Sequence, residues 1–224
     1  LGYVEANRLA LEAELFEAEG LIDKAMTGYE RAERLFSQQG AQREVAEMCW
    51  HQASLLLQQG NHAQADSLRQ SLFQTLSDIS APDLTARWHA LSARSLLGRH
   101  PAQALSHAQQ ALISAAASKQ SALDAEMQTL MADIYEQQGA SQLACDHRLQ
   151  ARRAWESMAV GLPESFRPAF WAHPRRSAHR PEPSLKAAPP TPRELLRILE
   201  INRRLNSSLA THDVLSFALD AAIE

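Results

Sequence analysis

The stretch that decides the fold is residues 9–32, LALEAELFEAEGLIDKAMTGYERA, because its pattern of small and aromatic residues returns three more times along the chain. One column of small residues recurs at steps of 40, 39 and 40, at Ala25, Ala65, Ala104 and Ala144. Three further columns keep the same steps: Ala13, Ala53, Ser92 and Ala132; Phe16, Leu56, Ser95 and Tyr135; and Ala32, Leu72, Ala111 and Ala151. A repeat of this length is typical of helical solenoids, whose units bury their apolar faces only against their neighbours.

A glycine near the middle of each unit predicts a turn between two helices, at Gly20, Gly60, Gly98 and Gly139. Because glycine has no Cβ, it adopts the left-handed conformation that ends one helix and reverses the chain. In the first unit the apolar spacing predicts helices over 3–19 and 22–38. We therefore expect an all-α fold, a right-handed superhelical solenoid of four helical hairpins at about 1–40, 41–80, 81–118 and 119–158.

The composition agrees with a helical protein and argues against several classes of function. The 224-residue chain is 45% hydrophobic, has 8 glycines and carries a net charge of −4, so it lacks the basic character of a nucleic-acid-binding domain. The sequence shows no signal peptide, and no apolar stretch approaches the roughly 20 residues that span a bilayer. Cys49 and Cys145 each fall within a helical pattern and are expected to be buried thiols, which fits a cytoplasmic protein.

No motif for catalysis or cofactor binding occurs in the sequence, which has no Walker loop, GxGxxG, GxSxG, HExxH or CxxC pair. Cys145 and His147 are close in sequence, but residues two apart on a helix diverge by about 200°, so their side chains cannot share one metal ion. We therefore expect no catalytic residue, no cofactor and no metal site in this chain.

The repeated pattern resembles the tetratricopeptide repeat (TPR). The first unit shows it as Leu9, Ala13, Phe16, Gly20, Ala25, Tyr29 and Ala32, and the fourth as Ala132, Tyr135, Gly139, Ala144 and Ala151. The resemblance covers residues 1–158, although the step is about 40 residues instead of the roughly 34 of the standard repeat. It implies a protein or peptide ligand bound in the groove of a helical superhelix.

The composition changes after residue 158. Residues 159–172 contain Phe166, Phe170 and Trp171 and are expected to cap the last repeat, and residues 173–191 form a predicted proline-rich linker. From residue 192 a new helical pattern places a coiled-coil seam at Leu195, Ile198, Asn202, Leu205 and Leu209. An Asn within such a seam specifies a parallel, in-register dimer, so we expect a homodimer through this helix.

The run from Glu194 to Glu224, ELLRILEINRRLNSSLATHDVLSFALDAAIE, resembles the signalling helix and first helix of a GAF domain. In multidomain bacterial regulators that contain GAF domains, TPR repeats often come first, and a sigma-54-dependent AAA+ module or a protein kinase lies elsewhere on the chain. This resemblance implies a role in signal transduction and transcription regulation. We expect the sequence to be one piece of such a longer protein.

The repeat predicts which first-helix positions face the groove of the superhelix: Glu14, Glu17, Trp50, His89, Asp133 and Glu136. Trp50 is expected to be exposed between polar neighbours and to contact a partner, whereas an ordinary solvated helix face is the alternative for the others. We expect a non-catalytic protein–protein interaction and signal-relay module. The alternative is a small-molecule sensor, which would need a closed, apolar cavity inside the superhelix.

Overall fold

The computed structural model describes residues 2–180, and its regular structure there consists of α-helices with one short 3₁₀ turn and no strand. The elements are α1 (Gly2–Ala18), α2 (Ile22–Gln38), α3 (Gln42–Gln58), α4 (His62–Asp78), α5 (Pro82–Leu96), α6 (Pro101–Ser118), α7 (Ser121–Gln137), α8 (Ser141–Val160), η1 (Glu164–Phe166), α9 (Arg167–Ala172) and α10 (Pro174–Ser177). The predicted all-α architecture is confirmed. The dimer-seam residues Leu195 to Leu209 lie outside the described residues.

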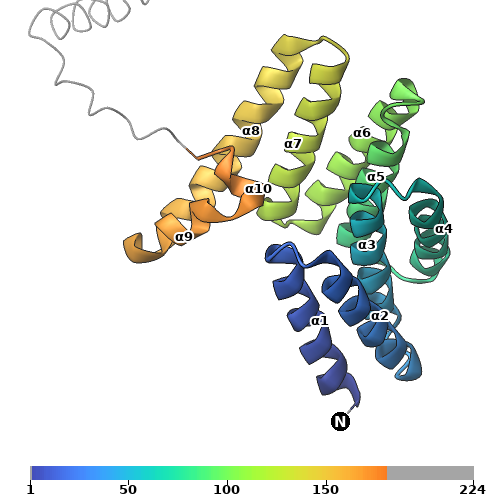
Figure 1. Ribbon diagram of the computed structural model, residues 1–224. Helices are drawn as coiled ribbons and strands as arrows, with labels where there is room; N and C mark the ends of the chain where they lie inside the picture. Colours follow the sequence, from blue (N-terminus) through green and yellow to red (C-terminus); the bar gives the residue numbers. More distant parts are fainter. Residues whose placement is uncertain (1, 181–224) are drawn as a thin grey trace, which may run out of the picture. The chain divides into compact units, whose positions relative to one another are not determined.

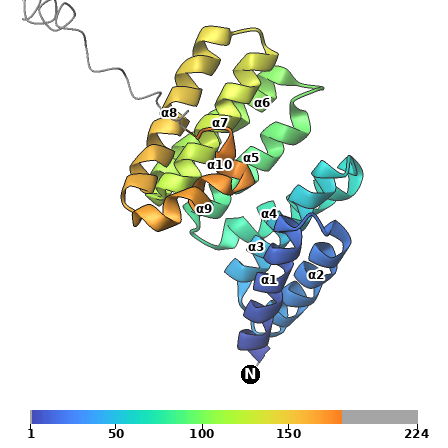
Figure 2. The same cartoon turned by 60° about the vertical axis from the view of Figure 1, so that its left-hand side comes forward.

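Helices α1 to α8 form four antiparallel hairpins that stack in sequence order (Figures 1 and 2). Within each hairpin, the first helix packs along the second, and the second helix packs against the first helix of the next hairpin. The first helices α3, α5 and α7 also contact one another in turn. Where two first helices contact each other, the contacting residues therefore come from different hairpins.

The turns inside three of the hairpins use the expected glycines. Gly20, Gly60 and Gly139 have φ angles of +76°, +75° and +75°, in the left-handed region that a residue with a Cβ rarely adopts. The third hairpin differs, because Gly98 does not have a positive φ and α6 begins only at Pro101. Proline suits this first helical position because its missing N–H would have no partner within the helix.

The four columns of the repeat lie inside the fold. Three of them are buried in all four hairpins, and in the fourth column Leu56 and Ser95 are buried while Phe16 and Tyr135 are half-buried. The two helices of the first hairpin approach so closely that a Cβ added to Gly28 would lie 2.8 Å from the Cβ of Ala13. Small side chains therefore set the distance between the helices of a hairpin.

The chain after α8 folds back onto the last hairpin. Trp171 is buried beside Ala159, and the rings of Phe170 and Trp155 meet edge to face with centroids 6.2 Å apart. Phe166, which was expected to join this cap, is exposed. The compact unit continues to Arg180, past the predicted start of the linker at residue 173, because His179 is buried and lies against α7.

The two cysteines have different environments, so the expectation that both are buried was wrong for one of them. Cys49 is buried in α3, whereas Cys145 is exposed on α8. Cys145 follows the buried Ala144, and one residue along a helix turns the side chain by about 100°, which places the thiol on the outward side. None of the described helices combines the length and apolar character needed to cross a membrane.

We predict that Ala104→Leu destabilises the fold by about 1–3 kcal/mol, because the larger side chain would force apart the helices that pack around this buried position. Ala102→Leu is the matched control, since Ala102 is exposed two residues earlier on the same helix. Urea unfolding followed by circular dichroism would measure both free energies. Equal losses in the two variants would contradict the assignment of the alanine columns to helix contacts.

Candidate functional site

A groove of about 450 Å³ runs across the first helices of the second, third and fourth hairpins. We call it the first-helix groove. Its lining consists of Trp50, Ser54, Leu57 and Gln58 of α3, His62 of α4, Leu91 and Arg94 of α5, and Glu126 and Thr129 of α7. The lining combines three large apolar side chains with hydroxyl, amide, imidazole and charged groups. Such a mixture can bind both the apolar side chains and the polar backbone of a peptide segment.

Trp50 lines this groove, but it is not the exposed residue that the sequence suggested. It is 5% exposed and packs in a cluster with Leu72 and Leu84. The guanidinium carbon of Arg87 on α5 lies 4.3 Å from the centre of its ring. Leu72 of its own hairpin and two residues of the third hairpin, Leu84 and Arg87, therefore enclose the indole. The prediction of an exposed Trp50 was wrong because its cover comes from a helix that is distant in sequence.

The polar neighbours of Trp50, His51 and Gln52, are buried with partners of their own. His51 stacks on Tyr29 of α2 with ring centroids 4.5 Å apart. Gln52 donates a hydrogen bond of 2.6 Å to Glu33. The polar residues beside Trp50 are thus no sign of a solvated face.

Glu14 and Glu17 of α1 lie near each other at the buried His51. The Nδ1 atom of His51 is 3.2 Å from a carboxylate oxygen of Glu17, and its Nε2 atom is 3.9 Å from a carboxylate oxygen of Glu14. Glu17 also accepts a hydrogen bond of 2.6 Å from the hydroxyl group of Tyr29. These contacts tie α1, α2 and α3 together. His51 was not among the residues predicted from the sequence. Its equivalents in the next two hairpins are Ala90 and Leu130, and because apolar residues at both positions indicate a buried site, the repeat predicts that His51 is buried too.

His89 contacts another histidine and does not line the first-helix groove. Its Nδ1 atom is 3.0 Å from Nδ1 of His107 on α6, and the ring of Trp88 meets both imidazoles edge to face. Burial lowers the pKa of both histidines, and the charge of Arg69 lowers the pKa of His107 further. At neutral pH the pair is therefore uncharged, with one ring donating a hydrogen bond to the other.

Asp133 and Glu136 lie on α7, but neither lines the first-helix groove. Glu136 pairs with Arg148 of α8 at 2.7 Å. Partial burial raises the pKa of Asp133, and the charges of Arg148 and Arg94 oppose this shift. The repeat step that leads from Trp50 to His89 leads next to Thr129, which does line the groove. Applying the step to the fourth hairpin would have found Thr129 from the sequence.

Thr129 also contacts the end of the described chain. Its hydroxyl oxygen lies 3.1 Å from Nε2 of the buried His179, and its hydroxyl group donates to the carbonyl oxygen of Ala125. Arg176, shortly before His179, stacks over the ring of Phe170 at 4.1 Å. The segment that follows the cap therefore reaches one wall of the first-helix groove.

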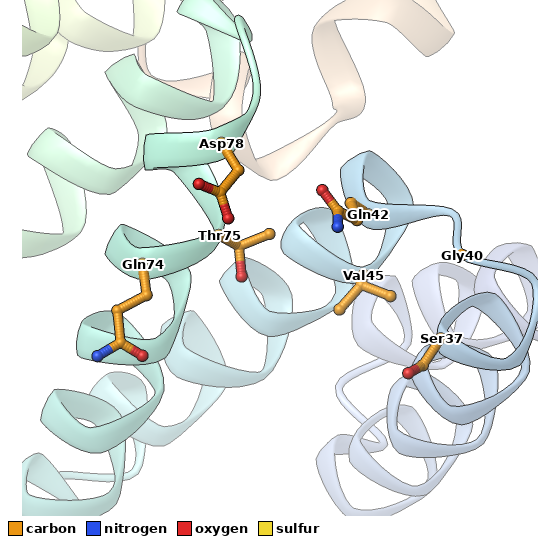
Figure 3. Close-up of a pocket in the computed structure, with 7 residues that line it drawn as sticks. All are labelled: Ser37, Gly40, Gln42, Val45, Gln74, Thr75 and Asp78. Atoms are coloured by element: carbon orange, nitrogen blue, oxygen red, sulfur yellow. The ribbon is translucent and has the colours of Figure 1, made fainter.

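A second hollow, of about 340 Å³, lies between α2, α3 and α4 (Figure 3). In Figure 3, Thr75 and Asp78 of α4 lie on one side of it, with Gln42 and Val45 of α3 on the other. Most of its lining residues are exposed, and Asp78 is its one charged residue. With no aromatic residue in its lining, it has less to offer a ligand than the first-helix groove.

Two further observations concern metal-ligating side chains and the cysteine thiol of α3. Within residues 2–180, no group of three or more His, Cys, Asp or Glu side chains is placed to hold a metal ion. Burial raises the pKa of Cys49 to about 12, with a contribution from Glu33. The nucleophilic thiolate form of this cysteine is therefore scarce at neutral pH.

Comparison with known proteins supports the fold. No family model and no curated protein matches the chain. Among solved structures it is similar to BtubC (BKLC) from P. vanneervenii, with a TM-score of 0.54 and 18% sequence identity. The match covers 71% of this chain and 66% of BtubC, so the chain spans just under two thirds of the length of that protein. At this identity the likeness shows a shared helical fold alone.

We predict that the histidine pair makes the fold less stable as the pH falls from about 7 to 5. Burial lowers the pKa of His89 and His107 below the 6.5 of an unfolded chain, so the unfolded state binds protons first and gains stability. The variant His107→Gln should lose less of its free energy of unfolding over this range than the parent. The exposed His100→Gln is the control and should follow the parent. Urea unfolding at each pH would test this, and parallel curves for all three proteins would refute it.

Proposed function

We propose that residues 2–180 form a non-catalytic interaction module that binds a segment of a partner protein in the first-helix groove. The observation that carries the proposal is the lining of this groove, to which three successive first helices contribute. A surface built from several repeats is the usual binding surface of helical solenoids. The resemblance to TPR repeats and to a GAF signalling helix supports a place in a bacterial cytoplasmic regulator.

The groove suits a peptide that carries both apolar and polar groups. Leu57 and the exposed part of Trp50 offer apolar contact, and Ser54, Gln58 and Thr129 offer hydrogen bonds of the kind a peptide backbone needs. Arg94 and Glu126 place one charge of each sign in the lining. A peptide with apolar side chains would therefore find contacts both for those side chains and for its backbone.

The volume of the groove also falls within the range of sites that bind small molecules, roughly 300–1,000 Å³. This observation favours the second candidate, a sensor of a small effector. The two candidates differ in the ligand that stabilises the protein, so a thermal-shift screen with metabolites beside a peptide selection distinguishes them. We favour the peptide because polar and charged groups make up much of the lining.

We further propose that a ligand in the groove acts on the chain that follows Arg180. Support comes from the contact of His179 with Thr129, because a groove ligand that reaches α7 would compete with His179 for this wall. The effect would then pass to the predicted dimer helix, whose seam consists of Leu195, Ile198, Asn202, Leu205 and Leu209. A relay of this kind requires a ligand that favours one of two arrangements of the segment.

The first test is a selection from a peptide library displayed on phage, with the 224-residue chain as the target. A selected peptide should lose at least about tenfold in affinity when Ser54 is replaced by Arg, because the long side chain would fill the groove. The matched control Gln74→Arg changes an exposed residue of the other hollow and should leave the affinity unchanged. Fluorescence anisotropy measures both. A peptide that binds Ser54→Arg as tightly as the parent would exclude this groove as its site.

The second test concerns His179. We predict that His179→Ala binds the selected peptide a few times more tightly, since the segment that contacts Thr129 would be held less firmly. Hydrogen exchange of residues 173–180 should become faster in the same variant. An unchanged affinity together with faster exchange would show that the segment does not compete with groove ligands.

A further inference from the structure

The first helices α3, α5 and α7 each have a face that is covered by the second helix of the preceding hairpin. On α7 this face contains Leu123, Leu130 and Ile134, which are buried in one cluster with alanines of α6. On α3 the same face contains His51 and Leu55, and both are buried beside Tyr29 of α2. On α3 and α7 this face is therefore an interface with the preceding hairpin. On α5 the positions of Leu130 and Ile134 are taken by the buried Ala90 and the exposed Arg94, so the interface is smaller there.

The repeat step identifies the corresponding face of α1. Counting back from α7 through the steps of 40, 39 and 40, the positions of Leu123, Leu130 and Ile134 become Val4, Leu11 and Leu15. These three aliphatic side chains are 72%, 61% and 64% exposed, whereas their counterparts on α7 are buried. At spacings of seven and four residues they lie along one side of the helix. We call them the α1 stripe.

The charged residues beside the α1 stripe do not make it a polar end face. Arg8 pairs with both Glu5 and Glu12 on the same helix. A charge also occurs on the corresponding face of α5, where Asp83, at the position of Val4, is buried and pairs with Arg43 of α3. Charged residues are therefore compatible with an interface between hairpins in this chain.

The two ends of the described stack differ. At the other end, Trp171 and Phe170 cover α8, as the terminal unit of a solenoid requires. Among the described residues nothing plays this part for α1, which begins the stack (Figure 1). The side chains of the α1 stripe are exposed. Three large exposed aliphatic side chains in one line on an end helix are typical of a surface that binds a neighbour, whereas the end face of a capped solenoid is polar.

We propose that the α1 stripe is the docking surface for the second helix of a further helical hairpin of the same polypeptide, placed before α1. The source follows from the chain itself, because the corresponding face is covered on both α3 and α7 by the hairpin that immediately precedes it in sequence. A head-to-tail contact with a second copy is disfavoured, since the cap of Phe170 and Trp171 covers α8. The docking helix should present small residues, as α6 does with Ala108, Ala111 and Ala115.

The chain can supply its own probe for this proposal. The hairpin of residues 81–120 precedes Ser121, and the repeat step carries Ser121 back to Gly2. Fusing a second copy of residues 81–120 directly before Gly2 of the full chain therefore places an alanine-rich second helix on the α1 stripe. We expect the fusion protein to unfold in one transition, with a melting temperature several degrees above that of the parent chain.

The double variant Leu11→Glu with Leu15→Glu tests whether the α1 stripe forms that interface. It should lower the melting temperature of the fusion protein by several degrees and leave the parent chain nearly unchanged, because both side chains are exposed in the parent. The matched control is Leu143→Glu, at an exposed leucine of α8, which should have the same small effect in both proteins.

Three outcomes would overturn the proposal. The added hairpin could melt separately from the rest, or the double variant could destabilise parent and fusion equally. In sedimentation, the parent chain could form a dimer that the double variant abolishes, which would assign the α1 stripe to a second copy. None of these outcomes bears on peptide binding in the first-helix groove, so the two proposals stand or fall separately.

Discussion

The close packing of two helices through methyl-sized side chains is the constraint on which the rest of this structure depends. Where α1 crosses α2, Gly28 lies so close to Ala13 that even one more methyl group would clash. The buried alanines at 25, 65, 104 and 144 hold the same place in each hairpin. Because a protein interior has almost no spare volume, a longer side chain at these positions would shift one helix and every contact made by it.

This close packing has consequences for the polar residues of the first helices. The first helices α3 and α5 are each enclosed by their own second helix and by the hairpins on either side, so little of their surface remains for solvent. Polar side chains there are buried with partners, as His51 is between Glu17 and Tyr29 and Gln52 is beside Glu33. Such pairs join successive hairpins, and they fix the stacking more specifically than apolar contact alone.

The surface left open by this packing is where we place the function. The first-helix groove lies where α3, α5 and α7 meet, and the chain's own segment before Arg180 reaches its wall at Thr129. The α1 stripe is open for a different reason, because it lacks the neighbour that covers the same face in the later hairpins. One surface is suited to a ligand, and the other to extension of the stack.

The sequence by itself determined the four hairpins, three of their glycine turns and the buried columns, because these depend on contacts that repeat along the chain. The repeat step from Trp50 also leads to Thr129, but the prediction followed the charges and selected Asp133 and Glu136 instead. Only the tertiary structure decided that Trp50 is buried under Arg87, that Glu14 and Glu17 lie near His51, and that His89 pairs with His107. Each of these contacts joins different helices, so its geometry follows from how hairpins stack and not from any local pattern.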